Sequence, residues 1–111
     1  MRKFLVYPTA LLIWAGAGAC STAWAADAEM LARGKELFTG AAVPACAICH
    51  TMADAGAEGP IGPDLDELKP GKEVVLKVLR EGMGAMPSFT ETMSEEDMKA
   101  VAEYVVQATG G

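Results

Sequence analysis

The segment Cys46-Ala47-Ile48-Cys49-His50 constrains this chain more than any other. Two thiols at this spacing can form thioethers with the two vinyl groups on one edge of a porphyrin, and the imidazole of the next residue then lies under the iron. CxxCH is the attachment signal of c-type haem. We therefore predict one covalently bound haem c per chain, held by Cys46 and Cys49, with His50 as an axial iron ligand.

Other uses of a CxxC pair fit the sequence less well. A structural zinc site takes about four Cys or His ligands, whereas the chain has one histidine, His50, and one further cysteine, Cys20. A thioredoxin-like motif belongs beside a βαβ unit, and no strand-like alternation flanks residues 46–50. A CxxCH that arose by chance is the remaining alternative.

The amino terminus has the layout of a secretory signal peptide. Two basic residues precede an apolar run over residues 4–19, and Ala23-Trp24-Ala25 places small residues where signal peptidase cleaves. The run is shorter than the ~20 residues of a membrane-spanning helix, so an uncleaved anchor is the weaker reading. We expect a signal peptide over residues 1–25 and one cytochrome-sized domain over residues 26–111.

A lipid anchor is the minor alternative to this cleavage. Ala17-Gly18-Ala19-Cys20 resembles a bacterial lipobox, in which the cysteine is lipidated and becomes the new amino terminus, but leucine usually stands where Ala17 is. Both readings place the protein in the periplasm, where covalent haem is attached, with no transmembrane span in the mature chain.

The mature chain is small and acidic. Residues 26–111 carry seven Lys or Arg and fifteen Asp or Glu, a net charge of −8 before any haem. Such a chain is a poor candidate for binding nucleic acid or an anionic membrane. A chain of this size has a marginal apolar core, so we expect haem to complete the core and the apo form to be largely unfolded.

Hydrophobic periodicity predicts a small all-α domain. The expected elements are helices over residues 28–39, 72–81 and 94–107, one short turn over residues 64–68, and loops over residues 51–63 and 82–87, with no strand. Gly40 should end the first helix. Ser94 and Asp97 fit a capping box at the start of the last helix.

Each predicted helix has an apolar stripe. The stripes are Met30, Leu31, Gly34, Leu37 and Phe38, then Val74, Val75, Val78 and Leu79, then Met98, Val101, Ala102 and Val105. A glycine inside a helix costs about 1 kcal/mol relative to alanine. Gly34 therefore indicates either the close approach of another backbone or a helix that tolerates the loss.

Methionine is the natural candidate for the second axial ligand, because no other histidine exists and a lysine would have to lose its proton first. Met30 and Met98 are assigned to helix stripes, and Met52 is too close to His50 to reach the other side of the iron. The remaining candidates are Met83, Met86 and Met93. We favour Met86, because Pro87 fixes the backbone that follows it.

Methionine ligation has two consequences for function. It raises the reduction potential relative to other axial pairs, and it closes the iron to exogenous substrates. Both favour an electron carrier over an enzyme that activates oxygen or peroxide.

Five elements in this order resemble the small monohaem class I cytochromes c of bacterial periplasms. They are Gly34-Lys35-Glu36-Leu37-Phe38, the CAICH segment, Gly62-Pro63-Asp64-Leu65, Gly84-Ala85-Met86-Pro87-Ser88-Phe89 and a terminal helix with Tyr104-Val105. The resemblance implies a class I cytochrome c fold of three to five helices around one covalent haem.

The same resemblance implies roles for single residues. The Pro63 carbonyl would accept the proton on the second nitrogen of His50 and orient the ring, with Pro60 as a rival for this role. Leu65 would pack on the haem, and Met86 would be the distal ligand. Gly34 and Phe38 would meet Tyr104 where the first and last helices cross.

A narrower resemblance concerns residues 37–71, LFTGAAVPACAICHTMADAGAEGPIGPDLDELKPG. This run is similar to the haem subunit of bacterial sulfite dehydrogenases. In those systems a molybdenum enzyme oxidises sulfite and passes single electrons to a small cytochrome c. The resemblance implies that this chain is the electron acceptor and carries no sulfite chemistry itself.

Together these observations predict a periplasmic electron-transfer protein that is not itself an enzyme. Its donor would be a periplasmic dehydrogenase, with a molybdenum sulfite dehydrogenase as the narrower expectation, and its acceptor a cytochrome or oxidase of the respiratory chain. The alternatives are a haem enzyme or gas sensor with an open distal site, and a tightly held dehydrogenase subunit rather than a free shuttle.

Four basic residues precede the second loop: Lys69, Lys72, Lys77 and Arg80. They could steer an acidic partner. The simpler interpretation, which we favour, is a solvated helix face on which they mix with glutamates.

Overall fold

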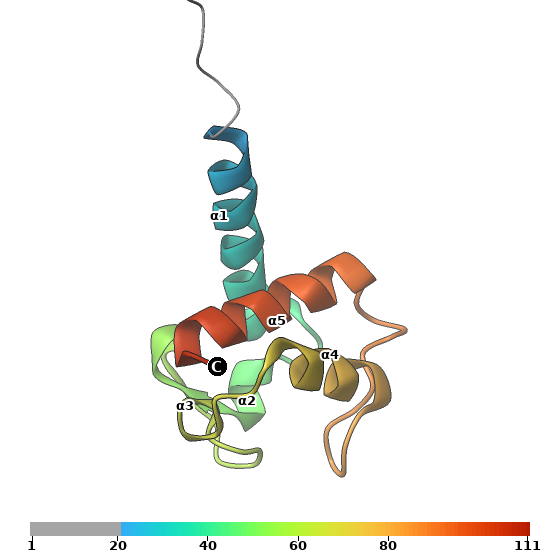
Figure 1. Ribbon diagram of the computed structural model, residues 1–111. Coiled ribbons are helices and arrows are strands. Elements are labelled where there is room, and N and C mark those ends of the chain that lie inside the picture. Colours follow the sequence, from blue (N-terminus) through green and yellow to red (C-terminus); the bar gives the residue numbers. More distant parts are fainter. Residues whose placement is uncertain (1–20) are drawn as a thin grey trace, which may run out of the picture.

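The computed structural model describes residues 21–111, and their side chains from residue 27 onward. The elements in chain order are α1 (Ser21–Glu36), a π-helical turn (Leu37–Ala41), α2 (Cys46–Cys49), β1 (Thr51–Met52), a 3₁₀ turn (Ala53–Ala55), β2 (Ala57–Glu58), α3 (Leu65–Leu68), α4 (Lys72–Glu81) and α5 (Glu95–Thr109). In Figure 1, α5 runs across the molecule, α1 rises above it, and α2, α3 and α4 gather below.

The first helix begins earlier than the predicted start at residue 28. The segment from Ser21 is rich in alanine, the strongest helix former, and it is helical throughout. The predicted cleavage point after Ala25 therefore falls within α1, whereas Cys20 and the predicted apolar run lie outside the described residues. None of the described helices combines the length and the apolar character needed to cross a bilayer.

The prediction that residues 51–63 contain no strand is wrong. β1 and β2 pair antiparallel, with Thr51 opposite Glu58 and Met52 opposite Ala57. Met52 and Ala57 are buried on one side of this hairpin, as the two-residue period of a strand requires. Each strand is only two residues long, too short for that period to be visible in the sequence. The rest of the all-α prediction is confirmed, because the other described elements are helices.

The prediction that Gly40 ends the first helix is also wrong. The helix widens into a π-helical turn, in which the Ala42 amide donates to the Leu37 carbonyl at 3.1 Å. This i→i+5 bond satisfies a carbonyl that a helix end would leave unpaired. Of the predicted stripe, Gly34, Leu37 and Phe38 are buried and Leu31 is partly buried, but Met30 is 39% exposed.

Helices α1 and α5 cross at Gly34, as predicted from the resemblance. A Cβ atom at Gly34 would lie 2.6 Å from Tyr104 Cβ and closer still to the Ala100 carbonyl oxygen. The rings of Phe38 and Tyr104 meet edge to face, with centroids 6.0 Å apart, a favoured aromatic arrangement. The missing side chain of Gly34 therefore allows the two backbones to approach.

The predicted capping box forms only in part, because the Asp97 side chain makes an ion pair beside this crossing. The Ser94 hydroxyl accepts from the Asp97 amide at 3.1 Å, so the N-cap is confirmed. The Asp97 carboxylate instead accepts two bonds from Arg33, both of 3.0 Å. This bidentate geometry is the strong form of an Arg–carboxylate pair, and it joins α1 to α5.

The β hairpin is fixed between α5 and α3. The Tyr104 hydroxyl donates to the Asp54 carboxylate at 2.6 Å, and Lys35 lies 3.5 Å from the same oxygen. Burial, together with this carboxylate, raises the pKa of Tyr104, and the hydroxyl lowers the pKa of Asp54. The Ala53 amide donates to Asp66 of α3 at 2.7 Å. The turn between β1 and β2 is thus bonded to α5 through Asp54 and to α3 through Ala53.

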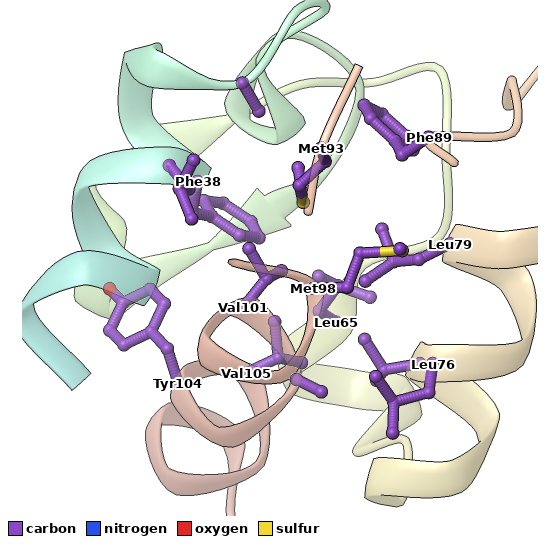
Figure 2. Packing of buried hydrophobic residues seen from close by; sticks show 14 of the residues in the cluster. Phe38, Leu65, Leu76, Leu79, Phe89, Met93, Met98, Val101, Tyr104 and Val105 are labelled. Carbon is purple, nitrogen blue, oxygen red and sulfur yellow. The ribbon is translucent and has the colours of Figure 1, made fainter. Parts of the chain in front are cut away.

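The core lies between α5, α4 and the π-helical turn (Figure 2). The predicted α5 stripe is confirmed, since all four of its residues are buried. In α4 the buried residues are Val75, Leu76 and Leu79, whereas Val74 is 55% exposed and Val78 is partly buried. The predicted buried stripe is therefore confirmed for Val75 and Leu79 and wrong for Val74, and it did not include the buried Leu76.

Replacing Gly34 by alanine should destabilise the protein, although alanine is the better helix former. The added methyl group forces α1 away from α5, and overpacking of this kind typically costs about 1–3 kcal/mol. A guanidinium titration of the haem-loaded protein, followed by circular dichroism, measures the change. Gly40→Ala is the control, because nothing lies within 4 Å of a Cβ at Gly40. Equal stability of the two variants would contradict the close crossing.

Candidate functional site

One apolar cavity, of about 410 Å³, brings the predicted site residues together. It lies between the CxxCH turn, the loop before α3, α4 and the segment that follows α4. The predicted residues that line it are Cys46, Cys49, His50, Pro63, Leu65 and Met86. Its volume is in the range of pockets that bind small molecules and cofactors.

The two cysteines lie on the single helical turn α2. Residues three apart share one face of a helix, and both thiols are free and partly buried against the cavity. The His50 amide donates to the Cys46 carbonyl at 2.9 Å and closes the turn. Burial raises the pKa of the Cys46 thiol to about 11. Redox-active cysteines have lowered pKa values, so this environment speaks against a thioredoxin-like role.

The imidazole of His50 is oriented by Pro63. Its Nδ1 lies 2.8 Å from the Pro63 carbonyl oxygen. A carbonyl only accepts, so Nδ1 carries the proton and donates, which leaves the lone pair of Nε2 available for a metal ion. This is the contact that the resemblance implied, and Pro63 rather than Pro60 makes it.

Two glycines allow the loop before α3 to touch the CxxCH turn, and the sequence analysis assigned no role to either. A Cβ at Gly59 would lie 2.5 Å from the Cys49 carbonyl carbon, and one at Gly62 would lie 2.6 Å from His50 Cε1. The Gly62 amide also donates to the Cys49 carbonyl at 2.7 Å. The sequence feature that could have indicated this close contact is the repeated Gly-Pro pair in Gly59-Pro60-Ile61-Gly62-Pro63.

The structure separates the three candidate methionines. Met83 and Met86 both line the cavity, whereas Met93 is 6% exposed and belongs to the protein core. Met83 and Met86 face each other in an antiparallel bridge, with N–O distances of 3.0 and 2.9 Å. Gly82 permits this tight turn, because its φ is 71° and a Cβ there would lie 2.8 Å from the Met86 carbonyl oxygen.

The walls of the cavity are apolar. The stripe predicted for α4, namely Val74, Val75, Val78 and Leu79, lines it as a whole. The stripe was therefore identified correctly as an apolar face, and it faces the cavity. Val75 and Leu79 also belong to the buried core, whereas Leu76 packs into the core without lining the cavity. Ile61, Leu68, Val74 and Met83 line the cavity and are each more than half exposed, which places apolar surface at its mouth.

Two of the four basic residues near the cavity are already neutralised. Lys72 pairs with Glu103, and Arg80 pairs with Glu95 at 2.8 Å. Glu103 raises the pKa of Lys72 and Glu95 raises that of Arg80, while the guanidinium of Arg80 lowers the pKa of Glu95. The pairing favours the interpretation of a solvated, mixed-charge helix face over a basic patch for a partner.

The residues of the cavity fit a covalently attached haem. Two thiols on one helical turn can form the two thioethers, His50 presents a free Nε2, and thioether side chains from another segment line the same space. Apolar side chains form the walls, and the loop of Gly59 and Gly62 lies against the imidazole with no room for a methyl group. We find no feature of the cavity that conflicts with the group.

Comparison with known proteins gives consistent matches. The model of the family described as cytochrome c oxidase, cbb3-type, subunit III matches residues 29–105, which include every residue that lines the cavity. Cytochrome c6 of Cladophora glomerata is 35% identical over 85 residues, 71% of this chain and 89% of that protein. Chloroplastic cytochrome c6 of Chlamydomonas reinhardtii is 33% identical over 120 positions, 98% of this chain and 72% of that protein.

A solved structure is also similar. The crystal structure of the c-type cytochrome SorU from Sinorhizobium meliloti superimposes with a TM-score of 0.71 at 46% sequence identity. The match covers 75% of this chain and 94% of that chain. The similarity therefore extends to nearly the whole of the solved protein.

Replacing Gly62 by alanine should displace the imidazole ring of His50. The new methyl group would overlap His50 Cε1, and the overpacking should lower the stability of the haem-loaded protein by about 1–3 kcal/mol. The measurement is the guanidinium concentration at which the low-spin haem spectrum is lost. Gly40→Ala, which adds the same methyl group to open space, should leave that midpoint in place. A Gly62→Ala protein with the wild-type midpoint would show that the loop does not fix the ring.

Proposed function

Because this chain belongs to the cytochrome c family, as a small monohaem class I cytochrome c with covalently bound haem c, we propose that it carries single electrons in the periplasm with His50 and Met86 as the axial iron ligands. Electron transfer is the role of the family to which it belongs. Beyond this role, we propose a ligand pair, a cellular compartment and redox partners for the protein.

One observation carries the ligand assignment. Two thiols, an imidazole with a free Nε2 and the Met86 thioether all line one apolar cavity. Met86 is half-buried and packs against the core, and its carboxyl side is held by Pro87 and by the Phe89 amide, which donates to the Leu79 carbonyl at 2.8 Å. A thioether held in this way needs little reorganisation to stay in place.

The bound haem supplies an iron ion that alternates between the ferric and ferrous states. The protein's own contribution is to keep the surroundings unchanged during that alternation. Pro63 fixes the His50 ring through one hydrogen bond, the apolar walls exclude water, and a methionine ligand raises the reduction potential. With His50 and Met86 holding the iron from both sides, electron transfer would be favoured over reaction with small molecules.

The periplasmic location is supported by the signal-peptide layout of residues 1–25. Cleavage after Ala25 would leave α1 to begin at Ala26, which keeps Gly34 and its close approach to Ala100 and Tyr104 of α5. Lipidation at Cys20 would keep the same contacts and add an anchor. Mass spectrometry of the native amino terminus distinguishes the two.

The proposed donor is a molybdenum sulfite dehydrogenase, and the proposed acceptor is a cytochrome or an oxidase. The sequence resemblance over residues 37–71 supports the donor, and the 46% identity to the c-type cytochrome SorU supports the role of an electron-carrying cytochrome. The exposed apolar side chains at the cavity mouth, among them Ile61 and Leu68, offer a surface on which a protein partner can approach the haem.

Carbon monoxide should not bind to the ferrous wild-type protein at neutral pH, because a thioether closes the iron. Met83→Leu should behave in the same way, since Met86 remains. The double variant Met83→Leu/Met86→Leu should bind one carbon monoxide per haem, measured as the shift of the ferrous Soret band. Met93→Leu is the control, because Met93 lies in the core. Binding by the wild-type protein would favour the open-site enzyme or sensor instead.

Sulfite should reduce the ferric protein when periplasmic extract of its host is present. The α-band of the ferrous form reports the reduction, and reactions that lack sulfite or extract should remain ferric. Activity of the extract with an artificial electron acceptor shows that the dehydrogenase is intact. Absence of sulfite-dependent reduction in an active extract would remove this donor from the proposal and leave the electron carrier itself standing.

A further inference from the structure

The short hairpin after α4 presents two thioethers to the cavity. Met83 and Met86 are directly opposite each other in an antiparallel bridge closed by Gly84 and Ala85. Directly opposite residues of such a pair project on the same face, with Cβ atoms about 4.5–5.5 Å apart. Both methionines accordingly line the same cavity.

The two methionines differ in burial. Met86 is half-buried and packs against the core, whereas Met83 is 69% exposed and contributes nothing to the buried cluster. Packing therefore accounts for Met86 but not for an apolar side chain at position 83. An unbranched thioether with three rotatable bonds can reach positions that a branched side chain cannot.

The backbone on the two sides of the hairpin also differs. Met83 lies between Gly82 and Gly84, with φ of 71° and 56°, and nothing lies within 4 Å of a Cβ at Gly84. Glycine adopts other backbone conformations at little steric cost, so the Met83 arm can readjust. The Met86 arm is fixed, because the Ser88 hydroxyl donates to the Arg80 carbonyl at 2.6 Å beyond Pro87.

From this asymmetry we infer that Met83 is a reserve axial ligand, which takes the iron position of Met86 when the Met86 thioether is lost. The inference rests on the proposed function, in which Met86 is the resident ligand. Both side chains are neutral thioethers, so the exchange would replace one sulfur–metal bond by another, with no proton or electron transferred. The exchange keeps the iron closed to exogenous ligands while the hairpin moves.

The test compares ferric haem-loaded Met86→Leu with Met83→Leu/Met86→Leu. Leucine conserves the volume of methionine but has no sulfur. The readout is the weak charge-transfer band that a thioether gives with ferric haem, together with the upfield-shifted methionine methyl resonance of the ferrous protein. We expect Met86→Leu to keep both signals and to resist carbon monoxide, and the double variant to lose both.

A matched control separates Met83 from the remaining methionines. Met86→Leu/Met93→Leu should keep the signals, because Met93 does not line the cavity. Loss of the signals in Met86→Leu alone, or in this control, would overturn the inference. Loss in Met83→Leu alone would instead identify Met83 as the resident ligand and overturn the proposed function. If Met86→Leu does not accumulate, Met86→Ala gives the same comparison.

Discussion

The hydrogen bond from His50 Nδ1 to the Pro63 carbonyl is the contact on which the site depends. It fixes the tautomer of the imidazole and so decides that Nε2 faces the cavity. The bond requires the loop before α3 to lie directly against the CxxCH turn. Gly59 and Gly62 make that contact possible, because neither position has room for a Cβ atom.

The same loop leads into the scaffold of the whole fold. Asp64, next to Pro63, caps α3 by accepting from the Asp66 amide at 2.9 Å, and Asp66 in turn accepts from the hairpin at Ala53. The hairpin is tied to α5 through Tyr104. A continuous series of polar contacts therefore connects the imidazole to the helix crossing, and α5 itself lines the cavity with Val101 and Val105.

Helix α4 explains how so short a chain can surround a large cofactor. Its apolar residues serve two environments, since Leu76 packs into the protein core while Val74 and Val78 line the cavity. A chain of this size has only a marginal apolar core of its own, and an apolar group in the cavity would extend that core. The asymmetric hairpin with its two thioethers completes this enclosure on the side of the segment that follows α4.

Local patterns in the sequence determined the attachment turn, α4, α5 with its Ser94 cap, and the chemical nature of the site, because these depend on residues close together in the chain. Only the tertiary structure decided which of the three candidate methionines reach the cavity, since Met93 packs in the core with residues that are distant in sequence. It also decided that Asp97 binds Arg33 rather than closing its own cap. Local sequence patterns could not predict the two-residue strands or the π-helical turn, because the hydrogen bonds of these elements depend on the tertiary packing around them.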